Sequence, residues 1–214
     1  MKDETLVLDN SIEKKIAKFI SYLLHPLLMP TYGFVLLFYT KNYISTFTPQ
    51  NSKLILVLIT FAFTFLFPTL NTLILLKMKR IKTLEMESTK ERVIPYLSTS
   101  VYFFALFYLF HTAHLPKTFN VLILGAAISI LLTLFINFKW KISAHSIGIG
   151  GIIGAIIGIS YRLHIDLQFL LFIVIALSGL VGYARLKLNV HSPAQVYTGF
   201  LLGFLVELFL MFIY

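Results

Sequence analysis

Residues 119–138 read FNVLILGAAISILLTLFINF and contain no charged side chain. A stretch of about 20 apolar residues is long enough to cross the hydrocarbon core of a membrane as one helix. A helix is needed there because it pairs its own backbone hydrogen-bonding groups, for which lipid offers no partners. The stretch therefore predicts a transmembrane helix.

The rest of the chain is similarly apolar. Hydrophobic residues make up 58% of the 214, charged residues make up 13%, and the mean hydropathy is +0.86, which excludes an ordinary soluble domain. Six further candidate spans lie at 19–40, 54–76, 96–110, 145–161, 167–183 and 193–213. We expect an all-α polytopic transmembrane helix bundle over 19–214, preceded by a polar segment at 1–18. Because 96–110 and 145–161 are the shortest spans, six spans are an alternative to seven.

The formal net charge of +9 comes from basic residues in short loops between the spans. Anionic lipid headgroups, and not nucleic acid, are the expected partners there. Seven spans would place the N-terminus and segments 78–95, 139–144 and 184–192 on one side of the membrane, here called the motif side. Of the 18 lysines and arginines, those outside it are Lys41, Lys53, Lys117 and Arg162. This asymmetry predicts an integral protein of the inner membrane with the motif side in the cytoplasm.

Three stretches on the motif side carry residues suited to phosphate chemistry. They are EMESTKERVIP at 85–95, KISAHSIGIGG at 141–151 and ARLKLNVHSPAQ at 184–195. Arg92, His145, Arg185 and His191 can therefore meet at one end of the bundle. Guanidinium groups bind phosphate oxygens bidentately, and imidazole can serve as nucleophile or proton donor near neutral pH. Together they predict a site that handles phosphate.

Helix starts add to this prediction. Ser143 is placed to cap the span at 145–161, whose first backbone N–H groups would attract an anion. In the last span Ser192, Pro193 and Gln195 fit the N-cap, N1 and N3 positions. His191 would then lie just outside the helix on a rigid turn.

These stretches resemble the type 2 phosphatidic acid phosphatase superfamily, whose motifs are K-x6-R-P, P-S-G-H and S-R-x5-H-x3-D. Arg185 and His191 have the separation of the third motif, and Arg92 matches the arginine of the first. The resemblance implies that His191 is the nucleophile that forms a phosphohistidine. It also implies that His145 is the acid that protonates the leaving oxygen.

The chain departs from the family pattern at several positions. Glu85 replaces the lysine of the first motif, for which Lys82 or Lys90 could substitute. Ala184 and Ile142 replace a serine and a proline, and Gln195 replaces the aspartate that supports the nucleophilic histidine. Because a neutral amide stabilises an imidazolium less than a carboxylate does, we expect slow or specialised chemistry. Family members usually face the outside of the cell, which leaves the orientation open.

We therefore expect a lipid phosphatase or phosphotransferase that cleaves a lipid phosphomonoester or diphosphate without a metal or other cofactor. The expected catalytic residues are His191, His145 and Gln195, and the expected substrate-binding residues are Arg92, Arg185, Ser143, Ala144 and Lys90. The alternatives are a protein that binds or translocates lipid phosphate without turnover, and a structural scaffold.

Residues outside the motifs receive other interpretations. The glycines at 150, 154, 158, 199 and 203 recur every fourth residue, which favours close helix packing. His25, His111, His114 and His164 lie near span ends, where hydration explains them. Glu207 either marks a pathway or reaches the interface. For Gln195, helix capping explains the residue as well as catalysis does.

Overall fold

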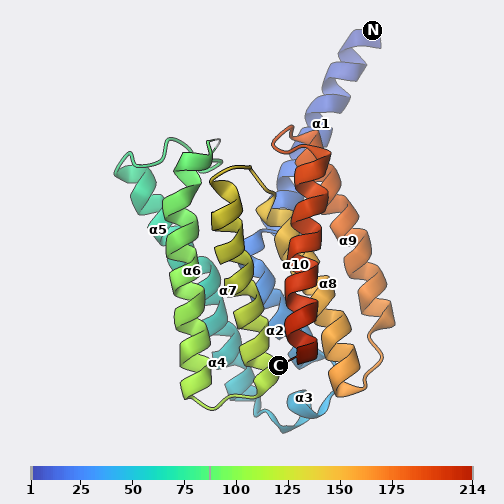
Figure 1. Ribbon diagram of the computed structural model, residues 1–214. Helices are drawn as coiled ribbons and strands as arrows, with labels where there is room; N and C mark the ends of the chain where they lie inside the picture. Colours follow the sequence, from blue (N-terminus) through green and yellow to red (C-terminus); the bar gives the residue numbers. More distant parts are fainter. Residues whose placement is uncertain (1, 87, 214) are drawn as a thin grey trace.

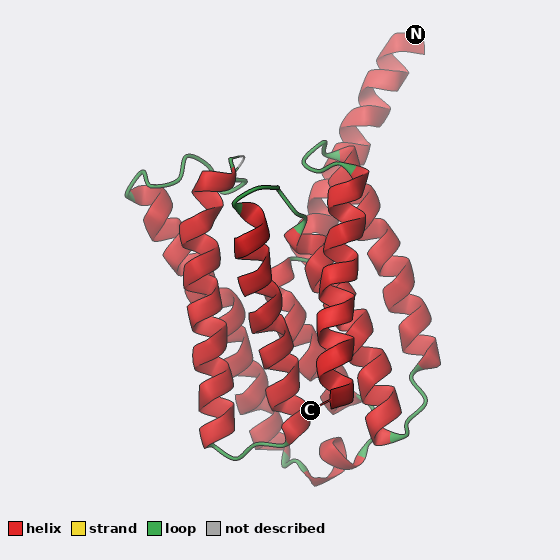
Figure 2. Cartoon of the chain, in the orientation of Figure 1, coloured by secondary structure: helices red, strands yellow, loops and turns green. Residues whose placement is uncertain are grey.

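The computed structural model describes residues 2–86 and 88–213, and all regular structure within them is helical (Figure 2). Seven helices in this part of the chain are long and apolar enough to cross a membrane. The predicted all-α bundle is therefore confirmed, with seven spans and not six. Loops gather at the two ends of the bundle (Figure 1).

The seven spans are built from the following elements. The first span, Ile12–Tyr39, takes in the second half of α1 (Lys2–Leu23), η1 (Pro26–Leu28) and α2 (Met29–Tyr39), and is followed by the short α3 (Tyr43–Phe47). The second span comprises α4 (Gln50–Phe61), η2 (Ala62–Leu66) and α5 (Phe67–Lys77). The other spans are α6 (Thr89–Thr112), α7 (Lys117–Asn137), α8 (Ala144–Leu163), α9 (Gln168–Lys187) and α10 (Pro193–Ile213). The polar N-terminal segment forms the start of α1 and continues into the first span without a break.

Helix α6 begins earlier than hydropathy predicts. Ser88 caps it by accepting a hydrogen bond from the Glu91 backbone N–H at 3.3 Å. The first turns of α6 are polar, so the apolar pattern begins only near residue 96, although the backbone is helical from Thr89. Arg92 consequently lies on the helix itself and is buried.

Proline interrupts both of the first two spans. Pro26 begins the 3-10 turn η1, whose N-cap is His25. Pro68 lies one residue beyond the start of α5, directly after the π-helical turn η2. Proline has no backbone N–H to donate to the preceding turn, which accounts for irregular geometry at both places. The break at Pro26 occurs near the middle of the first span, which runs from Ile12 to Tyr39.

Glycines allow α8 and α10 to pack backbone against backbone. A Cβ atom added at Gly154 would lie 2.6 Å from the carbonyl oxygen of Phe204, and one added at Gly203 would collide with the carbonyl oxygen of Ile147. These approaches confirm the packing interpretation of the recurring glycines. A backbone hydrogen bond of 3.3 Å from Ser143 N to Gln195 O ties the starts of the two helices together.

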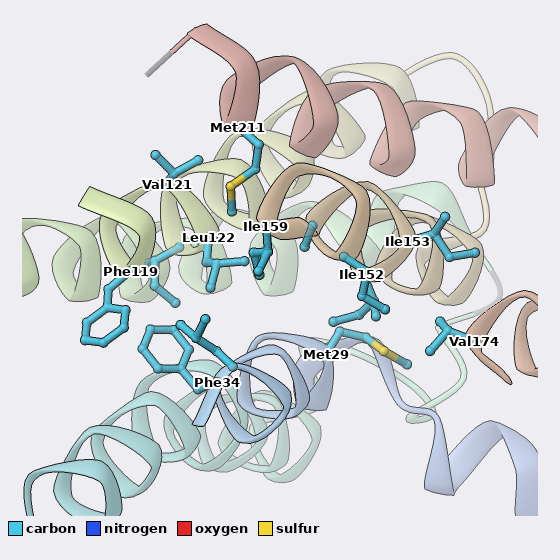
Figure 3. Packing of buried hydrophobic residues seen from close by; sticks show 14 of the residues in the cluster. Met29, Phe34, Phe119, Val121, Leu122, Ile152, Ile153, Ile159, Val174 and Met211 are labelled. Carbon is cyan, nitrogen blue, oxygen red and sulfur yellow. The ribbon is translucent and has the colours of Figure 1, made fainter. Parts of the chain in front are cut away.

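The core lies where α2, α7, α8 and α10 meet (Figure 3). Phe34 of α2 and Phe119 of α7 pack with their ring centroids 5.2 Å apart. Many large apolar side chains point outward instead; Phe169 is 80% exposed and Phe209 is 63% exposed. Such an outer surface requires lipid as its solvent.

The loops that carry the motifs lie at one end of the bundle. Segments 78–86, 138–143 and 188–192 are all found at the end from which α1 extends (Figure 1). The predicted common side of these segments is thus confirmed.

Candidate active site

His191 is held at the start of α10 by a complete capping box. The Gln195 Oε1 atom accepts a hydrogen bond from the Ser192 backbone N–H at 3.1 Å, and Ser192 Oγ accepts one from the Gln195 backbone N–H at 3.4 Å. The same Oε1 atom lies 3.1 Å from His191 Nδ1. Gln195 therefore caps the helix, as one of its two interpretations predicts, and it also contacts the histidine.

These contacts fix the neutral tautomer of His191. The Ser192 N–H can only donate, so the Gln195 atom that faces it must be the carbonyl oxygen. An amide oxygen can only accept, so His191 Nδ1 must be the donor in the second bond. The proton of the neutral ring is then on Nδ1, and Nε2 keeps a free lone pair, as a nucleophile requires.

The surroundings of His191 also favour its neutral form. Burial lowers the pKa of His191 from 6.5 to about 3, and the Arg185 charge is the next largest cause. The charges of Arg92 and Lys141 lower this pKa further, while the hydrogen bond to Gln195 opposes them. His191 is accordingly unprotonated at neutral pH and sits in a field of positive charge.

Arg185 reaches this cluster from the last turn of α9. Its Nη1 atom donates a hydrogen bond of 3.1 Å to Ser21 Oγ on α1. Its Nε atom is buried and has no hydrogen-bond partner among the described residues. A buried N–H group without a partner is rare in folded proteins, so this donor indicates a missing acceptor.

Arg92 approaches from α6 and is 7% exposed. Its Nε atom donates to the Met86 carbonyl at 2.8 Å, and its Nη2 atom donates to the Glu85 carbonyl at 3.4 Å. The Arg92 and Arg185 charges act on each other. Within the described residues neither forms an ion pair with a carboxylate; the ion pair found there joins Lys187 to Glu13.

His145 occupies the second position of α8, in contact with the first span. Its Nε2 atom lies 3.1 Å from the Ser21 carbonyl oxygen, which can only accept, so Nε2 must donate. In the neutral ring, Nδ1 then carries no proton. His145 also interacts electrostatically with Arg185 and His191. Electrostatic interactions thus link Arg92, His145, Arg185 and His191 at the motif side.

The first span contributes two residues that the sequence motifs do not identify. Ser21 contacts both Arg185 and His145, through its hydroxyl and its carbonyl respectively. His25 packs edge to face on His145, with the ring centroids 5.4 Å apart. The interpretation of His25 as a residue near a span end is wrong, because it lies in the middle of the first span, half-buried, with its ring edge to face against Phe65 and His145. A histidine-proline pair inside an apolar span was the available signal.

The other three predicted substrate contacts lie at the starts of α6 and α8. Lys90 is exposed on α6, whereas Lys141, which received no role, is the lysine whose charge acts on His191. Ser143 caps α8 as predicted, but its side chain is 0% exposed and its hydroxyl is bonded to Ser146, so it cannot also hold substrate. Ala144 opens α8 and can offer only backbone groups.

Two open cavities on the described surface lie away from this cluster. One, of about 310 Å³, lies between α8 and α9 and is lined by Ser160 and Leu171; the other, of about 400 Å³, lies between α5 and α6 and is lined by Asn71 and Tyr102. Neither includes a residue of the predicted site. No group of three or more histidine, aspartate or glutamate side chains suited to a metal ion is found in the described residues.

No protein-family model matches the chain, and no match was found among curated proteins or solved structures.

Proposed function

We propose that this protein is a membrane lipid phosphatase or phosphotransferase that cleaves a lipid phosphomonoester or diphosphate through a phosphohistidine intermediate. The observation that carries the proposal is the position of His191, whose free Nε2 lies in the field of two arginines that have no ion-pair partner among the described residues. A phosphate group would supply the negative charge that these arginines lack.

In the first step, Nε2 of His191 attacks phosphorus in line with the leaving oxygen. The Nε2–P bond forms as the P–O bond to the lipid breaks. Arg92 and Arg185 neutralise the remaining phosphoryl oxygens, and the unpaired Arg185 Nε–H is available to one of them. The Nδ1–H of His191 stays bonded to Gln195, so the ring keeps its orientation throughout.

Proton transfer is assigned to His145. Its Nε2–H is engaged by Ser21, so the proton for the leaving oxygen must be carried on Nδ1 of a doubly protonated ring. The negative charge of the bound phosphate offsets the nearby arginine charge and favours that second proton. After it is donated, the bare Nδ1 accepts a proton from the water that attacks phosphorus, and the P–N electron pair returns to His191.

Gln195 sets the expected speed of this chemistry. Its amide oxygen orients the imidazole, as a carboxylate would, but adds no full negative charge to stabilise the developing imidazolium. The proposed enzyme is therefore slower than one with a carboxylate at this position. We propose that the motif side faces the cytoplasm because most of the basic residues lie there.

The second candidate function is a protein that binds or translocates lipid phosphate without turnover. The absence of a carboxylate beside His191, where the chain has Gln195, favours this second function. The two functions differ in one product, which is phosphate covalently bound to histidine.

The test uses purified protein in detergent, offered phosphatidic acid, a polyprenyl diphosphate and a lipid A diphosphate, with free phosphate as the readout. His191→Ala should abolish release while the protein stays folded. His111→Ala is the matched control, because His111 is exposed at the opposite end of the bundle. Radiolabel from the substrate should remain on the protein in base and be lost in acid, as phosphohistidine is. Release by His191→Ala at the wild-type rate would refute the mechanism, and tight binding without labelled histidine would favour the second function.

A further inference from the structure

Glu207 is a buried carboxyl group that the proposed phosphate chemistry does not use. It lies on α10, 14 residues beyond Pro193 and thus about 21 Å from the start of the helix. Its side chain is 4% exposed, and its Oε1 atom has no hydrogen-bond partner among the described residues. The interpretation of Glu207 as reaching the interface is therefore wrong.

Two glycines make room for this carboxyl group. A Cβ atom at Gly125 of α7 would collide with Glu207 Oε2 and lie 2.7 Å from Cδ. A Cβ atom at Gly154 of α8 would lie 3.2 Å from Glu207 Cβ. The carboxyl group thus packs between α10 and α7, and α8 packs against the Cβ atom of Glu207.

The positive charges on the helices around Glu207 lie at the helix ends: Lys117 begins α7, and Arg162, near the end of α8, donates a hydrogen bond of 3.3 Å to the Met211 carbonyl, four residues beyond Glu207 on α10. Among the described residues, the ion pair that is found joins Lys187 to Glu13 and does not include Glu207. Helix α7 has no ionisable residue between Lys117 and Asn137, and α8 has none between His145 and Tyr161. On α10 itself the other ionisable side chain is Tyr197. An ionised carboxylate without a counter-charge is strongly disfavoured inside a membrane, so this geometry calls for a proton on Glu207.

A line of buried polar residues leads from Gly125 toward the motif side. The line continues on α7 at intervals of four residues, about 6 Å apart, with Ser129, Thr133 and Asn137. Each step of four residues also advances around the helix, so the line begins on the side that faces α10 and ends on the side that faces α6. The Thr133 hydroxyl donates to the Ser129 carbonyl at 2.6 Å. At the end of the line Asn137 Nδ2 donates to the Thr89 carbonyl at 2.7 Å, while Asn137 Oδ1 is buried without a partner. Single waters can bridge gaps of this size between polar groups.

We propose that Glu207 is a proton-binding site within the membrane, and that its proton exchanges with water on the motif side through the buried polar residues Ser129, Thr133 and Asn137 of α7. This inference stands apart from the phosphate chemistry, because no hydrogen bond among the described residues joins the carboxyl group or these α7 side chains to the side chains of the histidine and arginine cluster.

The test is infrared spectroscopy of the full chain in lipid vesicles, transferred from H2O to D2O. A protonated carboxyl group gives a C=O stretching band that shifts to lower frequency when its proton is replaced by deuterium. We expect wild-type protein to show such a band, Glu207→Gln to lack it, and Ser129→Ala with Thr133→Val to slow its shift several-fold. Ser178→Ala, which removes a hydroxyl on α9, should leave the exchange rate unchanged. If the glutamine variant does not fold, isotopic labelling of glutamate carboxyls identifies the band in wild-type protein.

Each part of the proposal can fail separately. A spectrum without an exchangeable carboxyl band from Glu207 would overturn the proton site. Exchange as fast in the double variant as in wild type would overturn the route along α7. Neither result depends on whether the protein hydrolyses lipid phosphate.

Discussion

Replacing Gln195 by leucine tests whether the amide selects the reactive form of His191. The substitution removes the oxygen that accepts from both His191 Nδ1 and the Ser192 backbone N–H. Loss of a neutral hydrogen bond costs about 0.5–1.5 kcal/mol. Applied to the tautomer equilibrium, this lowers the population with a free Nε2 by between about 2-fold and about 13-fold. We expect kcat/KM for phosphate release to fall by the same factor.

Ser192→Ala separates this effect from helix stability. It removes the hydroxyl that accepts from the Gln195 N–H, but it keeps the backbone N–H that holds the Gln195 side chain. Loss of an N-cap side chain costs about 1 kcal/mol. Both variants should therefore unfold at lower temperature, whereas only Gln195→Leu should show a large loss of rate.

The assay combines free-phosphate kinetics with nitrogen NMR of labelled histidine, which distinguishes the two neutral tautomers. In wild-type protein the proton should be on Nδ1 of His191, and Gln195→Leu should shift it partly to Nε2. The reasoning is refuted if the leucine variant keeps both the wild-type tautomer and the wild-type rate. It is equally refuted if Ser192→Ala loses as much activity as Gln195→Leu, because helix capping would then explain the effect.

Four further results are expected. Gln195→Glu should raise the rate and the pKa of His191, since a carboxylate favours the imidazolium; complete loss of activity in a folded variant would contradict the assigned mechanism. The pKa of His191 is lowered from 6.5 to about 3 in the folded protein, so the unfolded chain binds the extra proton first as pH falls. His191 should therefore lower the free energy of unfolding as pH falls from about 6.5 to about 3. A His191→Gln variant whose acid unfolding matches that of wild type would count against this. Gly203→Val should destabilise the α8–α10 pair by about 1–3 kcal/mol in thermal unfolding, whereas Gly179→Ala, with no atom within 4 Å of the added Cβ, should not. Cysteines introduced by Lys139→Cys and Lys41→Cys, at two exposed positions, should react with an impermeant thiol reagent from opposite sides of the membrane. The Lys139→Cys variant should react from the cytoplasm. Labelling of this variant from the outside would reverse the proposed orientation.

The bundle follows from the sequence because hydropathy over a whole span is a large and local signal. Caps at Ser143 and Ser192 were equally predictable, since each is bonded within four residues of itself. The start of α6 was not, because its first turns are polar and hydropathy cannot distinguish them from a loop.

The site was predictable only where its residues lie in motifs. Arg92, His145, Arg185 and His191 were identified by type and spacing. Ser21 contributes to the site through contacts with residues more than 100 positions later, and no local pattern indicates such contacts. Lys90 lies two positions before Arg92, but position along the chain does not determine which side of α6 a side chain occupies, and Lys90 is exposed.

The interruption at Pro26 has a chemical effect five residues upstream. Helix α1 ends at Leu23, and the last four carbonyls of a helix lack partners within it, so the Ser21 oxygen is left for another donor. His145 is that donor. In an uninterrupted helix, a backbone N–H group of the next turn would donate to this oxygen. The neutral His145 ring could then carry its proton on Nδ1 instead of Nε2. The pyrrolidine ring of Pro26 on the first span thus decides which nitrogen of His145 on α8 carries the proton of the neutral ring.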